Sequence, residues 1–460
     1  MQLVAYGAQD VFLTGNPQVT FFKNIFRRYT NFAIESIEQT FTGAADFGKK
    51  VTCTVSRTGD LIHRTYLRIE IPEVEVKPGR KFRWLNSLGH ILLKTADVDV
   101  GGMRIDKHYG DWLHIWNELT QTAGHQLGYA NMMGNIPRLT NVTEVADGAT
   151  DSVIVPGHTL YIPLEFWFCT NTGLALPLIA LQYHEVRINV EFGEKKDCYW
   201  AQKSDGSGGW VADQNSVQVN SLNSASLFID YIFLDTEERR RFAKVAHEYL
   251  IEQLQFTGDE STNTQNNKLK LSLNHPVKEL IFVVQPDEFT TDEVANEKMG
   301  KEWFNYTDDF DPSLDPASSY TASGSMPGVA AGGSNGTFLP VNFDGGKNCV
   351  KQAKLQLNGH DRFAERDGMY FNVIQNYQHH ENVPKNGINV YSFALKPEEH
   401  QPSGTCNMSR IDTVQLNLTL TKESTKNAAG DNRTCKIKVY GRGYNILRVM
   451  SGMGGLAYSN

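Results

Sequence analysis

Two clusters of side chains in this sequence are of types that bind metal ions. His379 and His380 are adjacent, but neighbouring side chains on an extended strand point to opposite faces, so they are badly placed to share one ion. The acidic run 308–311, followed by Asp315, could offer oxygens to calcium, but it lacks the D-x-D-x-D-G order and the distal glutamate of an EF-hand loop. We interpret the histidines as solvated loop residues and the aspartates as an acidic turn, and we expect no metal and no other cofactor.

The sequence has none of the common catalytic or nucleotide-binding signatures. There is no G-x-x-x-x-G-K-S/T phosphate loop, no G-x-G-x-x-G after a strand, no H-E-x-x-H and no G-x-S-x-G. The six cysteines lie far apart and form no C-x-x-C pair, which favours free, packed thiols over a zinc or redox site. The sequence therefore predicts a protein that is not an enzyme.

Charge and hydropathy argue against further classes of function. Asp and Glu number 52 against 44 Lys and Arg, and an acidic chain is a poor candidate for wrapping nucleic acid because that affinity comes mainly from neutralised phosphates. The basic run 239–241 follows Glu237 and Glu238, so we expect a helical salt-bridge face there. No apolar run approaches about 18 residues and the first residues do not resemble a signal peptide, so we expect folding in the cytosol.

Several Asn-x-Ser/Thr sequons are candidate glycosylation sites, although most of them are expected to arise by chance. Asn417 lies in a predicted strand, which disfavours modification. Asn305 and Asn335 lie in a long polar stretch and are the better candidates.

Most of the chain is predicted to form β-strands. Apolar and polar residues alternate along 186–192 and 414–420, as expected of strands with one buried face. Glycine, proline and asparagine turns separate such segments, which is typical of β-sandwiches rather than α/β units. Helical spacing or capping is found at 20–32 and at 235–252.

The same order of strand-like segments appears on both sides of the central helical segment. The matched pairs are 67–72 with 279–286, 98–104 with 355–362, and 186–192 with 414–420. This order favours two β-sandwich domains of the same design joined by a short charged helix near 235–247, with chance similarity among generic strands as the alternative. Two polar stretches, 195–226 and 287–347, are predicted to be long loops that project into solvent.

Blocks of sequence at both ends carry a resemblance to a known family. Residues 2–23 read QLVAYGAQDVFLTGNPQVTFFK, which resembles the start of the major capsid proteins of nucleocytoplasmic large DNA viruses, especially those of algal viruses. Further blocks follow in the family's order at 29–36, 104–109, 173–186, 230–236, 247–253, 401–407 and 444–458. The resemblance spans the whole length, but 195–226 and 287–347 match nothing in the family pattern, and Met1 abuts a block that family members often precede with a few more residues.

The resemblance implies an all-β fold of two tandem eight-stranded jelly-roll β-sandwiches, with short helices at the N-terminus and in the linker. The corresponding segments are an N-terminal arm at 1–26, a first jelly roll at 27–234, a helical linker at 235–247, a second jelly roll at 248–445 and a C-terminal tail at 446–460. The resemblance also implies a homotrimer that forms a pseudo-hexagonal capsomer of an icosahedral virion shell, made and assembled in the host cytoplasm. Neighbouring capsomers and minor capsid proteins are the implied partners, and no direct contact with nucleic acid is expected.

The arm has two alternative roles. Its apolar residues could anchor the chain to neighbours or minor proteins inside the shell, and together with Lys23, Arg27 and Arg28 they could contact an internal viral membrane. Alternatively, they fill the base of the first jelly roll. The apolar residues concerned are Tyr6, Phe12, Phe21, Phe22, Ile25 and Phe26.

Two other classes of protein remain alternatives to a shell protein. A two-domain carbohydrate-binding protein would use similar sandwiches, and an enzyme on a β-sandwich would need convergent polar groups in a pocket. Self-association without a ligand favours the structural protein, whereas glycan binding by the soluble chain favours the binding module.

Overall fold

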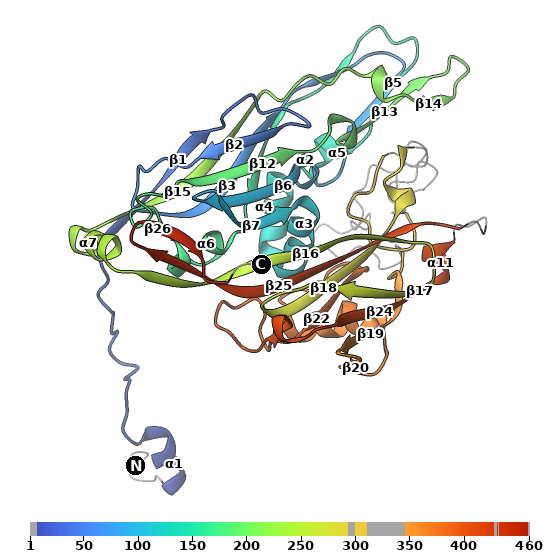
Figure 1. Ribbon diagram of the computed structural model, residues 1–460. Coiled ribbons are helices and arrows are strands. Elements are labelled where there is room, and N and C mark those ends of the chain that lie inside the picture. Colours follow the sequence, from blue (N-terminus) through green and yellow to red (C-terminus); the bar gives the residue numbers. More distant parts are fainter. Residues whose placement is uncertain (1–6, 293–299, 311–345, 427–429, 431, 459–460) are drawn as a thin grey trace.

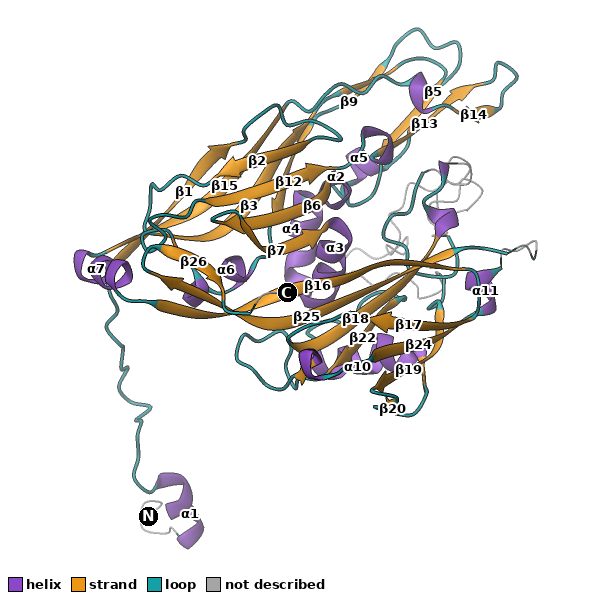
Figure 2. Cartoon of the chain, viewed as in Figure 1, coloured by secondary structure: helices purple, strands orange, loops and turns teal. Residues whose placement is uncertain are grey.

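The chain folds into two β-sandwiches that lie side by side and are joined by helix α7, Thr236–Lys244 (Figures 1 and 2). The computed structural model describes residues 7–292, 300–310, 346–426, 430 and 432–458. An N-terminal arm leaves the first sandwich close to α7 and ends in α1, Ala8–Thr14, well away from both sandwiches (Figure 1).

The first sandwich consists of two antiparallel sheets. One sheet has the order β1 Phe32–Thr40, β15 Ser224–Leu234, β3 Leu61–Ile71 and β10 His158–Pro163, with β11 Leu176–Pro177 also on β3. The other has the order β2 Lys50–Thr54, β12 Val186–Phe192, β6 Leu93–Val100 and β7 Met103–Tyr109.

The second sandwich repeats this design. One sheet has the order β16 His247–Thr262, β25 Cys435–Met450, β18 Pro276–Pro286 and β22 Ile388–Ser392, with β23 Cys406–Asn407 on β18 and β26 Met453–Leu456 on β25. The other has the order β17 Asn266–Leu271, β24 Val414–Leu420, β19 Val350–Leu357 and β20 His360–Asp361, with β21 Arg366–Asp367 on β19. The segment from residue 446, predicted to be a C-terminal tail, continues β25 and returns as β26, so it is part of a sheet.

Both sandwiches have the same strand order. Numbered one to eight along the chain, the main strands form sheets in the order 1-8-3-6 and 2-7-4-5 in each half. This is the jelly-roll arrangement, and the predicted tandem double jelly roll is confirmed. The three segment pairs that indicated a repeat fall on strand three, on the hairpin of strands four and five, and on strand seven in both halves. Their similarity therefore reflects equivalent positions and not chance.

The turn between strands four and five is repeated as well. Gly101 and Gly102 have φ values of 60° and 84°, and Asn358 and Gly359 have φ values of 51° and 81°. Two consecutive residues at positive φ match the right-handed twist of a tight hairpin, and Gly-Gly or Asn-Gly adopts them at little steric cost. The same local chemistry closes the same hairpin in both halves.

The sheet β16-β25-β18-β22 is buried on both faces. Along β18, Leu280 and Phe282 pack into the second sandwich, whereas Ile281 and Val283 belong to the hydrophobic core of the first. Nearly every residue of β18 is therefore buried, while β24, with one face inward, alternates buried and half-buried residues. The two jelly rolls share one continuous apolar contact.

The helix predicted at 20–32 is wrong. Residues 15–31 contain no helix, α1 lies earlier in the chain, and β1 follows directly. A short amphipathic segment gains helical stability mainly by burying its apolar face, and that face packs on nothing here. The central helix is shorter than the predicted 235–252 because β16 begins at His247.

The stretch 195–226, predicted to be a loop, contains strands. β13 Tyr199–Ser204 lies between β14 Trp210–Ala212 and β5 Arg80–Trp84, and β5 also pairs with β8 Thr143–Val145. This sheet projects beyond the first jelly roll (Figure 1), and Tyr199 and Trp200 are buried in it. The polar composition of the stretch concealed these aromatic residues, which pack with β5 from a distant part of the sequence. Most of 287–347 lies outside the described residues.

The remaining elements are short. They are β4 Val74–Val76, β9 Val153–Val155, α2 Leu88–Leu92, α3 Gly110–Thr120, α4 Ala123–Met132, α5 Pro137–Thr140, α6 Trp167–Thr170, α10 Gln375–His379, α11 Lys422–Thr425, η1 Thr172–Leu174, η2 Lys195–Asp197, η3 Gln214–Ser216, η4 Asp287–Phe289, η6 Tyr370–Ile374 and η7 Met408–Arg410. Of these, α3 and the helical segment η6–α10 both connect strand five to strand six of their jelly roll.

Candidate functional site

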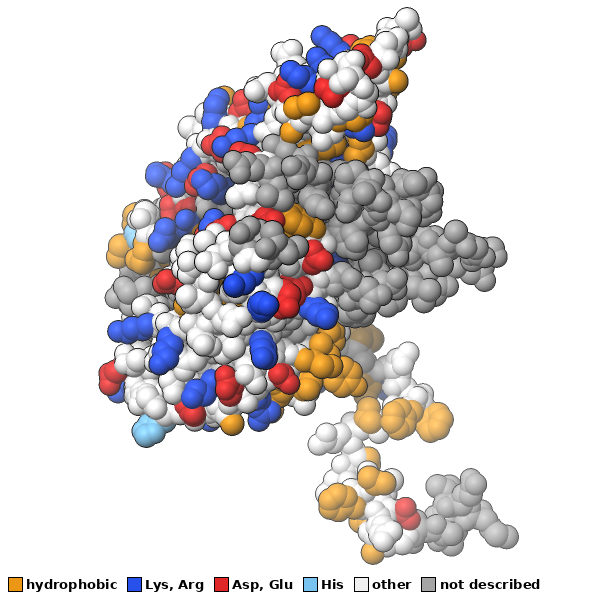
Figure 3. All heavy atoms as spheres, turned by 90° about the vertical axis from the view of Figure 1, so that its right-hand side faces the viewer, with side chains coloured by type: hydrophobic (Ala, Val, Ile, Leu, Met, Phe, Trp, Pro, Cys, Tyr) orange, Lys and Arg blue, Asp and Glu red, His pale blue; other side chains and the backbone are white. Residues whose placement is uncertain are grey.

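The N-terminal arm presents a row of exposed apolar side chains. Phe12, Phe21 and Phe22 are 93%, 93% and 99% exposed, and Ile25 and Phe26 are also exposed. The arm extends away from the body, and its apolar side chains are visible below it in Figure 3. These residues do not fill the base of the first jelly roll in this chain. Exposed apolar side chains of this number are uncommon on one segment, so the arm is a candidate interaction site.

Tyr6 and three basic residues of the arm are the other candidates predicted from the sequence. Tyr6 lies outside the described residues. Lys23, Arg27 and Arg28 are exposed along the same segment, so the arm is both apolar and basic.

A second candidate site lies between the two jelly rolls, where α3 packs on β25. The Trp112 ring lies 5.6 Å from the Tyr440 ring, and the Arg442 guanidinium lies 3.9 Å from the centre of the Trp116 ring. Asp111, at the start of α3, forms an ion pair with Lys438. Trp112 and Trp116 are one helical turn apart, and Lys438, Tyr440 and Arg442 are alternate residues of one strand, so the two elements meet along one side of each.

Hydrogen bonds that involve backbone groups extend this contact. The Leu254 amide donates to the Asp106 carboxylate at 3.2 Å, and the Gln253 side chain donates to the Ile105 carbonyl. The Asn382 amide donates to the Leu119 carbonyl at 3.1 Å at the other end of α3. The two halves are therefore joined by directional bonds as well as by apolar packing.

Beneath α3, the second jelly roll holds a cluster of buried charges. Lys278 Nζ lies 2.6 Å from Glu252 Oε1, and Glu279 lies 3.2 Å from Arg442 and 3.1 Å from His380. Arg442 also pairs with Glu252. Each charge has a partner of opposite sign, which such burial requires.

The pKa shifts in this cluster follow from these pairs. Burial would raise the pKa of Glu279, but His380 and Arg442 outweigh it and lower the pKa to about 2. Burial would lower the pKa of His380, but Glu279 and Glu398 raise the pKa to about 9. Burial lowers the pKa of Lys278 to about 8, despite Glu252 and Glu279. Glu279 and His380 are thus held charged near neutral pH.

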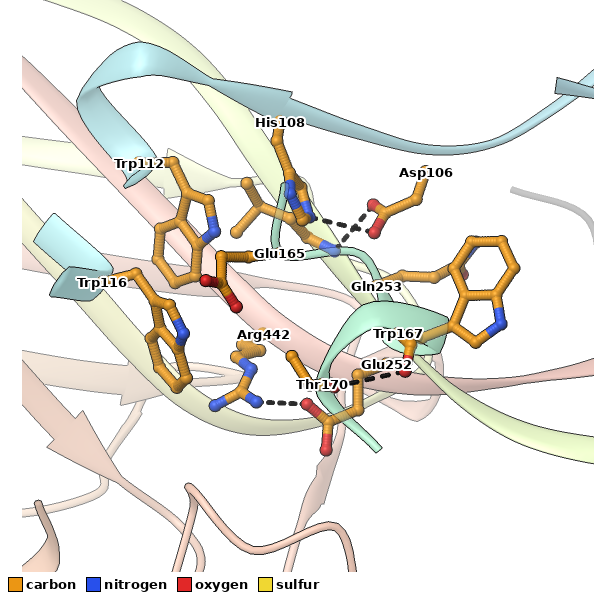
Figure 4. A pocket seen from close by; sticks show the side chains of 11 residues that line it. Asp106, His108, Trp112, Trp116, Glu165, Trp167, Thr170, Glu252, Gln253 and Arg442 are labelled. Carbon is orange, nitrogen blue, oxygen red and sulfur yellow. Dashed lines mark hydrogen bonds and ion pairs between the residues drawn. The ribbon is translucent and has the colours of Figure 1, made fainter. Parts of the chain in front are cut away.

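A small cavity of about 30 Å³ lies at the edge of this contact (Figure 4). His108 and Asp106, paired at 3.0 Å, line it from the first jelly roll, and Glu252 and Arg442 line it from the second. The Glu165 carboxylate also points into it, and burial raises the pKa of this group. A volume of this size holds about one water molecule, so the cavity has no room for an organic substrate.

The two adjacent histidines, for which no metal was predicted, have different surroundings. His380 is buried between Glu279 and Glu398, so its interpretation as a solvated loop residue is wrong, whereas His379 Nδ1 contacts the Leu395 carbonyl at 3.0 Å. The sequence could not reveal carboxylates that come from other strands. Within the described ranges, no group of His, Cys, Asp or Glu is placed to hold a metal ion.

The other predicted candidates are structural where they are described. Arg239 pairs with Asp60 of the first jelly roll at 2.8 Å, rather than with the acidic residues before it on the helix. Asp308 accepts a hydrogen bond from the Lys347 amide at 2.6 Å, while Asp311 and Asp315 lie outside the described residues.

Of the two glycosylation candidates, only Asn305 lies within the described residues. The Asn305 amide nitrogen donates to Glu302 and, at 2.9 Å, to the Asp309 carbonyl. Asn335 lies outside the described residues. All six cysteines are free, as predicted. Among the described residues, no helix has the length and apolar character needed to cross a membrane.

Comparison with known proteins decides the family. A sequence model described as "Major capsid protein N-terminus" matches residues 20–235, and one described as "Large eukaryotic DNA virus major capsid protein" matches residues 238–455. The major capsid protein of Phaeocystis pouchetii virus is 50% identical to this chain, over 100% of this chain and 99% of that protein. The chain belongs to the major capsid proteins of large eukaryotic DNA viruses. It is a structural component of the virion capsid and not an enzyme, and it contacts neighbouring capsid subunits.

Solved structures agree with this assignment. A crystal structure of PBCV-1 VP54, fitted into a cryo-EM reconstruction of the virophage Sputnik, is 34% identical, with a TM-score of 0.71 over 96% of this chain and 100% of that chain. A quasi-atomic model of the PBCV-1 virus capsid gives a TM-score of 0.68 at the same identity and coverage. These relatives are capsid proteins, so neither the carbohydrate-binding alternative nor the enzyme alternative is supported.

Sequence reasoning missed the contact between the jelly rolls. Trp112 and Trp116 on α3 were not predicted, although Trp112, Leu113, Trp116 and Leu119 have the spacing of a helical apolar face. That spacing would have revealed the helix. It would not have revealed that Tyr440 and Arg442, more than 300 residues away, cover it.

Proposed function

We propose that three copies of this capsid protein form a trimer whose six jelly rolls make a pseudo-hexagonal capsomer, and that such capsomers tile an icosahedral shell. The observation that carries the proposal is the repeat itself: two jelly rolls of identical strand order lie side by side in one chain. A six-sided outline suits the tiling of flat facets. The stiff sandwiches bury their own cores, which leaves their flanks free to contact copies.

The N-terminal arm fits a docking role on the inner side of the shell. Phe12, Phe21 and Phe22 are almost fully exposed, and large aromatic residues of this kind act as anchors in protein interfaces. We infer that these residues bind neighbouring capsomers or minor capsid proteins. The basic residues of the arm make an internal membrane the second candidate partner.

The division of the chain and its place of assembly belong to the same proposal. The segment 27–234 forms the first jelly roll of the capsomer. The second begins with β16 and extends past residue 445 to include the end of β25 and β26, and the charged linker between the two contains α7. Assembly in the host cytoplasm agrees with the predicted cytosolic folding of the chain and with its free cysteines.

Light scattering on a sizing column tests the trimer. The purified full-length chain should have three times the chain mass of 51.6 kDa and should keep it on dilution. A monomer at every concentration would contradict the proposal.

The arm is tested with Phe21→Ser/Phe22→Ser. The double variant should form the same trimer with an unchanged melting temperature, because neither side chain is buried, and should fail to assemble into shells. Val19→Ser is the matched control, because Val19 is an exposed apolar residue of the same arm with a smaller side chain than phenylalanine. Normal shell assembly by the double variant would refute the docking role.

A further inference from the structure

The contact inside the chain joins two features that have defined positions in a jelly roll. The first is the connection between strands five and six of the first jelly roll, which contains α3. The second is the outer face of the 1-8-3-6 sheet of the second jelly roll, where Tyr440 and Arg442 on strand eight meet Trp112 and Trp116. An apolar helical stripe therefore packs on one face of a sheet.

The helical feature occurs a second time, and its outer face is uncovered. Strands five and six of the second jelly roll are joined by the segment 370–379, which comprises η6 and α10. Phe371 points into the core of that jelly roll. On the opposite side, Ile374 and Tyr377 are 41% and 80% exposed, and their separation of three residues places them on one helical face. Met369, directly before the segment, is 66% exposed.

The sheet feature also occurs a second time. Strand eight of the first jelly roll is β15, where Leu227 and Ile229 are fully buried and Phe228, between them, points outward. Phe228 thus stands on the same strand and the same face as Tyr440 in the second jelly roll. In the second jelly roll this face is covered by α3. In the first jelly roll Phe242 of α7 packs at one end of the face, on Ile232 and Leu234, while Phe228 is only half-buried.

The surroundings of Phe228 are suited to an apolar partner. Tyr161 on β10 lies 6.5 Å from Phe228 between ring centres and is 40% exposed. At the edge of the sheet, Phe32 and Ile34 of β1 are about half exposed on the face that Glu38 shares with Phe228. Exposed aromatic and aliphatic residues on one sheet face are typical of an interface with another protein.

We propose that the segment 370–379 of one copy packs on the outer face of the β1-β15-β3-β10 sheet of the next copy. The contact inside the chain is then repeated between chains. This inference rests on the proposed trimer and names its two contact surfaces. Because the surfaces differ, the contact is heterologous, and it forms a closed ring when the rotation between successive jelly rolls is regular. Three chains supply three internal and three external contacts of this kind.

Substitutions at the centre of each surface test the placement. Tyr377→Glu and Tyr161→Glu each place a charge in the proposed contact. We expect the concentration at which the trimer dissociates to be at least about tenfold higher for each variant than for wild type. Tyr183→Glu is the matched control, because Tyr183 is 76% exposed and lies beside the β25–β26 turn, away from both surfaces. Light scattering over a dilution series gives the mass.

A labelling experiment keeps the test independent of folding. Tyr377→Cys and Tyr161→Cys should react with a maleimide at least about tenfold more slowly in the trimer than Tyr183→Cys, since five of the six native cysteines are buried. Two results would overturn the surface assignment but not the trimer. One is rapid labelling of the cysteines at 377 and 161 in an intact trimer, and the other is unchanged trimer dissociation in both glutamate variants. A wild-type chain that is monomeric throughout would overturn the trimer and this inference together.

Discussion

The buried carboxylate of Glu279 should be a major contributor to the stability of the second jelly roll. It is fully buried and pairs with Arg442 at 3.2 Å and with His380 at 3.1 Å. Glu279→Gln keeps the shape and removes the charge, and breaking a buried pair in this way costs about 3–5 kcal/mol. Arg442 keeps Glu252 and His380 keeps Glu398, so the lower value, about 3 kcal/mol, applies. For a unit of roughly 200 residues this lowers the melting temperature by roughly 6–12 °C.

The pH dependence of the loss identifies its electrostatic origin. The raised pKa of His380, about 9, gives stability that is complete below its ordinary value of 6.5 and is lost as the pH rises to about 9. The lowered pKa of Glu279, about 2, gives stability that is present above its ordinary value of 4.5 and is lost as the pH falls toward 2. The difference between wild type and Glu279→Gln should therefore be largest between these ordinary values and should shrink on either side.

Thermal unfolding followed by tryptophan fluorescence is the assay, because Trp116 lies against Arg442. Melts are compared near pH 5.5 and near pH 9.5, on either side of the raised His380 pKa. Glu399→Gln is the control, since Glu399 pairs with Lys396 at 2.8 Å on the surface and its loss should cost less than about 1 kcal/mol. If Glu279→Gln lowers the melting temperature no more than the control, or lowers it equally at both pH values, the reasoning is refuted.

Three further predictions concern other parts of the chain. Burial raises the pKa of Glu165, so the wild-type chain loses stability as the pH rises through that raised value. Glu165→Gln should remove this pH dependence of the melting temperature and should melt higher than wild type near pH 8. A lower melting temperature of the variant would contradict the prediction. Gly359→Ala should cost about 1–2 kcal/mol in chemical denaturation, because φ is 81° while nothing lies within 4 Å of the added methyl group, and an unchanged midpoint would exclude backbone strain there. Deletion of residues 1–31 should leave the melting temperature unchanged, since the described arm buries no apolar side chain; a clear drop would show that the arm supports the fold.

The local pattern of the sequence was sufficient for the repeat. Alternation along 186–192 and 414–420 predicts strands with one buried face, and both are strand seven of their jelly roll. Glycine and asparagine turns were expected between the strands, and the structure places Gly-Gly at 101–102 and Asn-Gly at 358–359 in tight hairpins, because only a few residue types adopt positive φ without strain. Signals of this kind are carried by neighbouring residues, so they can be read without the fold.

The same local reasoning failed where the decisive partner is distant in the sequence. The apolar spacing at 20–32 is that of a helix, yet the segment is extended because nothing packs on it. The stretch 195–226 is polar in composition, yet it forms strands because β5, more than 100 residues earlier, supplies a pairing edge. His380 was interpreted as solvated, and two carboxylates from other segments bury it as a charged group.

The sequence by itself determined the fold class and the twofold repeat, because periodicity, turn chemistry and long matching blocks are properties of contiguous residues. It left open whether the aromatic residues of the arm are exposed, which the tertiary structure decided. Only the tertiary structure decided which faces are covered. Trp112 packs on Tyr440, and Glu279 receives Arg442 and His380, because the outer face of one sheet is pressed against the helical connection of the other jelly roll. Burial and pKa depend on such contacts between distant segments, which the order of residues along a strand does not contain.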